Sequence, residues 1–125
     1  MILSLLMAMA IIPATGSPLA DAAMVGDVVK VRLLLAENAD VNKAQGDGTT
    51  ALHWAAYRDD AMLVEALLEA GADVGATTRI GDLTPLFMAA RTGSANIIAA
   101  LLDSGSEVNT PTSTGTTALM MAAAA

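Results

Sequence analysis

The chain has 125 residues, which is the size of about one domain, and 54% of them are apolar although only 2% are aromatic. A core of small and medium aliphatic side chains favours close packing between helices, whereas strands prefer β-branched and aromatic residues. The net charge of −7 argues against nucleic acid and anionic membranes as partners, and the lack of cysteine excludes disulfides, thiolate metal sites and a cysteine nucleophile.

The first segment differs in composition from the rest of the chain. Residues 2–12 are almost wholly apolar, and Pro13 ends the run. The run has the length of a signal-peptide hydrophobic region and is shorter than the roughly 20 residues that span a bilayer. Small residues at Ala14 and Gly16 predict cleavage before Ser17, although no lysine or arginine precedes the run, which leaves a buried terminal helix as the alternative. We therefore expect a signal peptide or hydrophobic leader at 1–16, with an extracytoplasmic location if it is a signal peptide and a cytoplasmic one otherwise.

A motif recurs along the remainder with a period of 33 or 34 residues. It reads SPLADAA from residue 17, TALHWAA from residue 50, TPLFMAA from residue 84 and TALMMAA from residue 117. A second motif reads LLAENADVN from residue 34, LLEAGADVG from residue 67 and LLDSGSEVN from residue 101. The period predicts units at 17–49, 50–83 and 84–116 and a truncated fourth unit at 117–125. Because this last part is incomplete and apolar, we expect a fragment of a longer array.

Each unit predicts a helix, a turn, a second helix and a loop. The first helix begins at a hydroxyl side chain suited to an N-cap: Ser17, Thr50, Thr84 and Thr117. The second helix ends at residue types that adopt the left-handed conformation at low cost: Asn38, Gly71 and Gly105. Polar stretches at 42–49, 75–83 and 109–116 are predicted to project as turns, and the middle one is a residue longer.

These motifs resemble the ankyrin repeat, a 33-residue unit that opens Thr-Pro-Leu-His-x-Ala-Ala and closes Leu-Leu-x-x-Gly-Ala-Asp-Val-Asn. The resemblance covers residues 17–125. It implies an all-α solenoid of stacked helix-turn-helix units with projecting loops or β-turns. Two departures stand out: the motif histidine occurs only as His53, and Gly75 replaces a closing asparagine. We expect both departures to loosen hydrogen bonding between loops and helices locally.

Residues suited to catalysis or metal binding are few. His53, the only histidine, is either a base oriented by Asp59 or Asp60 or a structural histidine bonded to a neighbouring loop. No nucleophile and no second metal ligand stand at a recognisable spacing from it, which favours the structural interpretation. Gly46-Asp47-Gly48 is interpreted as a turn, because no Lys-Ser/Thr pair follows it as in a phosphate-binding loop. We expect no enzyme activity, cofactor or metal.

Five methionines are interpreted as core fillers rather than as an adaptable binding stripe. They are Met24, Met62, Met88, Met120 and Met121.

A candidate surface for partner binding comes from the ends of the first helices and from the loop tips. Arg58 and Arg91 are 33 residues apart, which predicts the same place in consecutive units, and the resemblance implies that this place faces the concave side. The candidate partner-binding residues are Lys43, Gln45, Asp47, Tyr57, Arg58, Arg79, Ile80 and Arg91. A strip of two arginines favours a partner with an acidic segment. The alternative is that the arginines pair with nearby aspartates: Asp27, Asp59 or Asp60.

The favoured function is a non-catalytic protein–protein interaction module that binds its partner through the concave helix face and the loop tips. The alternative is the recognition arm of a larger enzyme or toxin-like protein whose catalytic part lies beyond residue 125. A stand-alone hydrolase is disfavoured, because the chain shows no recognisable pairing of a nucleophile with a base.

Overall fold

The computed structural model describes residues 17–124, and all of the regular structure within that range is helical. The helices are α2 (Pro18–Val25), α3 (Val28–Ala36), α4 (Ala51–Tyr57), α5 (Ala61–Glu69), α6 (Pro85–Thr92), α7 (Ala95–Asp103) and α8 (Ala118–Ala124). The expected all-α fold is confirmed. The predicted leader at 1–16 and the final residue lie outside the described residues.

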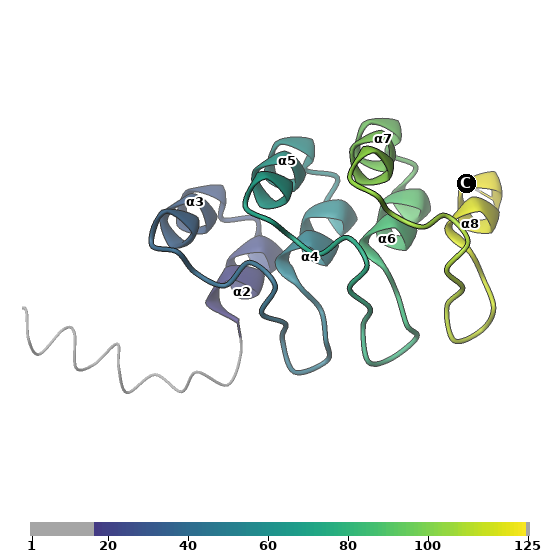
Figure 1. Ribbon diagram of the computed structural model, residues 1–125, viewed down its shortest axis with the longest axis horizontal. Coiled ribbons are helices and arrows are strands. Elements are labelled where there is room, and N and C mark those ends of the chain that lie inside the picture. The colour runs from purple at the N-terminus through teal and green to yellow at the C-terminus, as the bar shows by residue number, and fades with distance from the viewer. Residues whose placement is uncertain (1–16, 125) are drawn as a thin grey trace, which may run out of the picture.

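The helices form two rows (Figure 1). In one row α2 packs on α4, α4 on α6 and α6 on α8. In the other row α3, α5 and α7 each pack on the preceding helix of the first row. The connections that lead into α4, α6 and α8 all project from the same edge as turns (Figure 1). We call the side made by α2, α4, α6, α8 and these turns the inner face.

Local hydrogen bonds set where each first-row helix begins, as expected. The backbone N–H three residues on donates to the hydroxyl oxygen of Ser17, Thr50, Thr84 and Thr117. The predicted helix ends are confirmed as well, because Asn38, Gly71 and Gly105 all have a positive φ. Asn38 has a φ of 61° and is one of few non-glycine residues in the left-handed region, in keeping with the tolerance of asparagine for that conformation.

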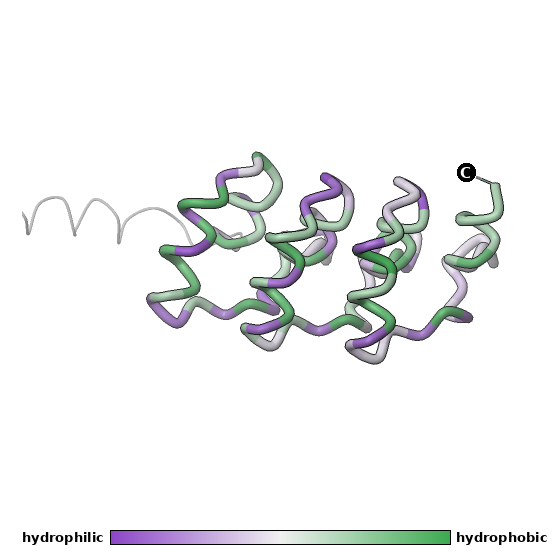
Figure 2. The backbone as a smooth tube through the Cα atoms, turned by 90° about the horizontal axis from the view of Figure 1, so that it is seen from above, coloured by the Kyte–Doolittle hydropathy of each residue, from purple (hydrophilic) through white to green (hydrophobic). Residues whose placement is uncertain are grey.

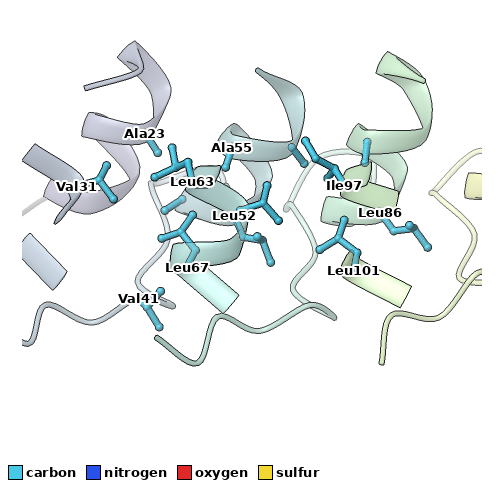
Figure 3. Close-up of a cluster of buried hydrophobic side chains, with 14 of the residues drawn as sticks. Ala23, Val31, Val41, Leu52, Ala55, Leu63, Leu67, Leu86, Ile97 and Leu101 are labelled. Carbon is cyan, nitrogen blue, oxygen red and sulfur yellow. The ribbon is translucent and has the colours of Figure 1, made fainter. Parts of the chain in front are cut away.

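The core runs continuously between the units rather than within any one of them (Figure 3). Leu63 and Leu67 of α5 lie in it beside Leu52 of α4, and all three are almost fully buried. Ala55 and Ala89 are fully buried where the first-row helices meet, since a small side chain lets two helix axes approach closely. No helix pair could bury these faces alone, so stacking provides the core.

The core-filler interpretation of the methionines is partly wrong. Met24, Met62 and Met120 are exposed, with Met62 at 68%. Met88 and Met121 do pack against the buried cluster. Leucine and alanine already occupy the helix positions that face a neighbouring helix, so the three other methionines are left on the solvent side.

The last helix repeats the motif without the same burial. Leu52 is 1% exposed, whereas Leu119 at the equivalent position of α8 is 66% exposed. Within residues 17–124 no second helix packs on α8 as α5 packs on α4. The tube of α8 is accordingly hydrophobic along most of its length and open on one side (Figure 2).

Candidate functional site

The three projecting turns share one backbone pattern but differ in length. Residues 45–49 are closed by a hydrogen bond from Gln45 N to Thr49 O at 2.9 Å, and residues 112–116 by an equivalent bond at 2.8 Å. The middle turn, residues 78–83, is closed by Thr78 N donating to Leu83 O at 3.0 Å, and therefore holds one more residue. The extra residue found in the sequence lies at this tip. We call these the first, second and third turns.

Hydrogen bonds join each turn to the next. Arg79 of the second turn donates from its backbone N to Asp47 O at 2.8 Å and from its guanidinium Nη1 to Gly46 O at 3.1 Å. Ser113 N of the third turn donates to Gly81 O at 2.8 Å. The three turns therefore form one connected ridge, in which the guanidinium of Arg79 adds a side-chain bond between the first and second turns.

Gln45 joins the first turn to the helices of two units. Its Nε2 donates to Asp21 Oδ1 of α2 at 2.7 Å, and its Oε1 accepts from Trp54 Nε1 of α4 at 2.8 Å. The rings of Trp54 and Tyr57 stand edge to face, with centroids 5.8 Å apart. Gln45 thus positions an aromatic pair on the inner face, whereas Lys43 lies exposed beside the same turn.

The expectation that Arg58 and Arg91 hold equivalent places is wrong. The N-caps Thr50 and Thr84 are 34 residues apart, so Arg91 is equivalent to Tyr57, and Arg58 to Thr92. The extra residue of the second turn shifts the register between these units by one. A matched pair of arginines therefore does not exist on the inner face.

The two arginines also differ in their contacts. Arg58 Nη1 donates to the carbonyl oxygen of Met24 at 3.2 Å, and its guanidinium lies against Gly26 at the end of α2. A cation near the C-terminal carbonyls of a helix is favoured by the helix dipole. Arg91 lies exposed in the last turn of α6. Met24, Tyr57 and Arg91 are thus the equivalent, exposed residues of successive units.

A pocket of about 210 Å³ lies between the first and second turns. Its walls come from both turns and from the helices that follow them: Asp47, Thr49, Trp54, Thr78, Ile80, Leu83 and Met88. Of this set, the sequence analysis proposed only Asp47 and Ile80 as binding residues and took Met88 as a core filler. Trp54 and Met88 stand at the unspecified position of the Thr-Pro-Leu-His-x-Ala-Ala motif, and that variable position was the signal that could have revealed them.

His53 is a structural histidine, as the second interpretation had it. Its side chain is fully buried; Nε2 donates to Leu83 O at 2.8 Å, and Nδ1 accepts from Thr50 N at 3.1 Å. Both ring nitrogens are therefore engaged by backbone groups that require the neutral ring with its proton on Nε2. The imidazole fastens the base of the second turn to α4.

Burial lowers the pKa of His53, despite the opposing effect of the Leu83 carbonyl and the charge of Asp47. The unfolded chain therefore binds the proton first, and stability is lost as the pH falls below the ordinary value of about 6.5. We expect the thermal unfolding midpoint to drop between about pH 7.5 and pH 5, and His53→Gln to remove most of that drop. Scanning calorimetry of both proteins at several pH values tests this. Equal pH dependence in the two would contradict it.

Other parts of the described chain offer less chemistry. A pocket of about 490 Å³ is an open groove between α3 and α5 with Arg32, Glu65 and Glu69 among its lining. Residues 17–124 bring together no three acidic or histidine side chains in an arrangement that could hold a metal ion. None of their helices has the length and apolar character required to cross a membrane.

The sequence that forms these turns and helix pairs matches the model of a known family. The family model described as "Ankyrin repeats (3 copies)" matches residues 3–78 and 63–125. This chain belongs to the ankyrin repeat family. The first match begins within the predicted leader.

Several longer proteins are similar to part of this array. Ankyrin repeat domain-containing protein 40 of Homo sapiens is 38% identical over 66 residues, which is 52% of this chain and 18% of the relative. Zinc finger CCCH domain-containing protein 24 of Oryza sativa subsp. japonica is 49% identical over 70 residues, 52% of this chain and 9% of the relative. Palmitoyltransferase akr1 of Schizosaccharomyces pombe is 48% identical over 50 residues, 40% of this chain and 8% of the relative. The aligned segment is less than a fifth of each relative.

The junction between the second and third units lacks two side-chain hydrogen bonds that join the first unit to the second. Asn42 Oδ1 accepts from Asp73 N at 2.6 Å, and Asn42 Nδ2 donates to Gly71 O at 3.3 Å. The equivalent of Asn42 in the next unit is Gly75, which has no side chain to make these bonds. A pocket of about 260 Å³ lies there, lined by Val74, Gly75, Thr84, Leu86, Gly105, Ser106, Glu107 and Thr110. The two hydrogen bonds of Asn42 thus have no counterpart from the side chain at Gly75, in keeping with the looser hydrogen bonding expected there.

Proposed function

We propose that this ankyrin array binds another protein through its inner face and has no catalytic role of its own. Ankyrin repeats imply a protein–protein interaction module. The observation that supports the inner face is the row Met24, Tyr57 and Arg91, which places exposed side chains of three successive units beside the connected turns. Tyrosine and arginine are residue types that often anchor interfaces.

The acidic character expected of the partner now depends mainly on Arg91. Arg58 lies beside the row, because its guanidinium is held by the Met24 carbonyl. A carboxylate of the partner would meet the guanidinium of Arg91 in two parallel hydrogen bonds. We therefore propose an acidic group in the partner at the α6 end of the row rather than along a strip of two arginines.

A comparison of two double variants of the full chain tests the proposed face. Used as bait against a lysate of the source organism, the unchanged chain yields partners that mass spectrometry identifies. For an identified partner, Tyr57→Ala/Arg91→Ala should weaken binding by about tenfold or more, because both residues lie in the proposed contact. Met62→Ala/Glu65→Ala changes two exposed residues of α5 and should leave the affinity unchanged. The reverse result would place the binding face on the second row of helices.

The recognition arm of a larger enzyme is the second candidate function. It is favoured by the similarity to two proteins named palmitoyltransferases, akr1 of Schizosaccharomyces pombe and Hip14 of Drosophila melanogaster, both of which extend far beyond the aligned segment. In this case the inner face would select a substrate or regulator for chemistry encoded elsewhere. The reading frame beyond Ala125 tests it directly.

We further propose an extracytoplasmic location for the array, with residues 1–16 removed as a signal peptide. The support is the apolar run that ends at Pro13 and the small residues before Ser17. N-terminal sequencing of the expressed protein from each cell fraction tests it. A cytoplasmic product that begins at Met1 would contradict it.

A further inference from the structure

The second turn carries the most exposed large aliphatic side chain among the described residues. Ile80 is 81% exposed, although its backbone is held from several sides. Thr78 Oγ1 donates to Ile80 O at 2.7 Å and accepts from Leu83 N at 3.0 Å. The left-handed φ values of Gly81 and Asp82, 88° and 53°, complete the tight tip. Ile80 is thus presented to solvent by a hydrogen-bonded scaffold.

The extra residue of this turn is what distinguishes it from the other two. The tip is fixed to the first turn by Arg79 and to the third by the Gly81 carbonyl. A rigid tip loses little conformational entropy when a partner docks. An exposed isoleucine at such a tip is a ready anchor for apolar contact, since its burial by a partner would order the side chain but not the backbone.

Ile80 forms one wall of the pocket between the first and second turns. Trp54, Leu83 and Met88 provide further apolar wall, so a side chain that enters would touch apolar atoms on several sides. The volume of about 210 Å³ is below the ~300–1,000 Å³ of pockets that hold drug-sized ligands. The pocket therefore suits one large side chain of a protein partner.

An acidic side chain lines this pocket, and a basic side chain lies beyond the wall residue Met88 on α6. Asp47 is part of its wall at the turn end, and hydrogen bonds from Thr49 hold the pKa of that carboxyl below its ordinary value, so the group stays ionised. Arg91 follows Met88 by three residues on α6, which is about one helical turn further from the ridge. An approaching segment therefore meets a negative charge, an apolar pocket and a positive charge in that order.

We propose that the pocket between the first and second turns binds one aliphatic or aromatic side chain of a partner segment that carries a basic residue toward Asp47 and an acidic residue toward Arg91. This inference rests on the proposed function, since it names the chemistry that the inner face recognises. The charge order gives the segment a direction along α6. The apolar side chain provides most of the affinity, and the flanking charges provide orientation.

Selection from a displayed library of random peptides against the full chain tests the inference. Enriched peptides should share an apolar residue with a basic neighbour on one side and an acidic neighbour on the other. For a synthetic peptide of the enriched sequence, Ile80→Ser should weaken binding by about tenfold or more, whereas Ile80→Leu should nearly restore it. Ile80 is so exposed that its replacement leaves the core intact. Exchanging the two charged residues of the peptide should weaken binding as well.

Met62→Ser provides the matched control, because Met62 is a similarly exposed apolar residue on α5. The affinity of the Met62→Ser variant for the peptide should equal that of the unchanged chain. Equal binding by the Ile80→Ser chain, or the lack of any enriched peptide, would overturn the pocket proposal. If Ile80→Ser has no effect while Tyr57→Ala/Arg91→Ala still weakens binding, the pocket proposal fails and the inner face stands as the binding face. If Met62→Ser alone abolishes binding, both the pocket proposal and the inner face as the binding face are overturned.

Discussion

Replacing Leu52 by alanine should lower the free energy of unfolding by about 2–5 kcal/mol, the cost typical of a buried leucine truncated to alanine. Leu52 is 1% exposed and belongs to the cluster that joins α4 to its neighbours. Removal of its branched end takes away apolar burial and leaves a cavity, because the surrounding helices relax only in part. In a chain of this size, such a loss is a large part of the total stability.

Leu119→Ala is the matched variant, and comparing its loss of stability with that of Leu52→Ala separates the effect of burial from the effect of motif position. Leu119 occupies the same place in the motif but is 66% exposed, so its truncation should cost well under the loss at Leu52. Urea unfolding followed by far-ultraviolet circular dichroism measures both. Equal losses in the two variants would mean that α8 is covered in solution. A negligible loss at Leu52 would contradict the stacked core.

The second large effect on stability is expected at the repeat position that holds Asn42 in the first unit and Gly75 in the second. Gly75→Asn should raise the free energy of unfolding by about 1–3 kcal/mol, from two restored hydrogen bonds at about 0.5–1.5 kcal/mol each and the reduced freedom of the unfolded chain. The position accepts a side chain, because a Cβ at Gly75 would meet only Asp73 Oδ1 at 3.4 Å. The cavity beside it provides the room.

Asn42→Gly is the reciprocal change and should lower the stability by a similar amount, because Asp73 N and Gly71 O lose their partner. Gly46→Asn is the control, since Gly46 has no neighbouring atom within 4 Å of a Cβ and should show only the smaller entropic gain. Thermal and urea unfolding of the three variants measure the differences. A gain at Gly75 no larger than that at Gly46 would show that the hydrogen bonds do not form.

The pocket at Gly75 marks a junction that lacks the side-chain hydrogen bonds of the preceding one. Ser106 Oγ is buried without a hydrogen-bond partner on its border, and unsatisfied buried oxygens lower stability. The first junction has the Asn42 bridge instead. Because repeat arrays are stabilised by interfaces between neighbours, the lack of this bridge removes part of the stability of the interface between the second and third helix pairs.

Much of the fold was determined by the sequence alone. The repeat period and the residues at helix ends, such as Thr50 and Gly71, predicted the helix pairs because capping is a local hydrogen-bonding requirement that a residue type reveals. The structural role of His53 followed for the same reason. Where a position needs only a particular side-chain acceptor or a left-handed backbone, the residue type in the sequence predicts its structural role.

The tertiary structure alone decided which of these residues face solvent and which come together. By contrast, the equivalence of Arg91 to Tyr57 rather than to Arg58 was already contained in the 34-residue spacing of Thr50 and Thr84, and the structure placed the extra residue at 78–83. The exposure of Met62, the pocket at Ile80 and the cavity at Gly75 all depend on what neighbouring units supply. The burial of a residue depends on which helix packs against it, and the local sequence of one helix does not specify how its neighbour packs on it.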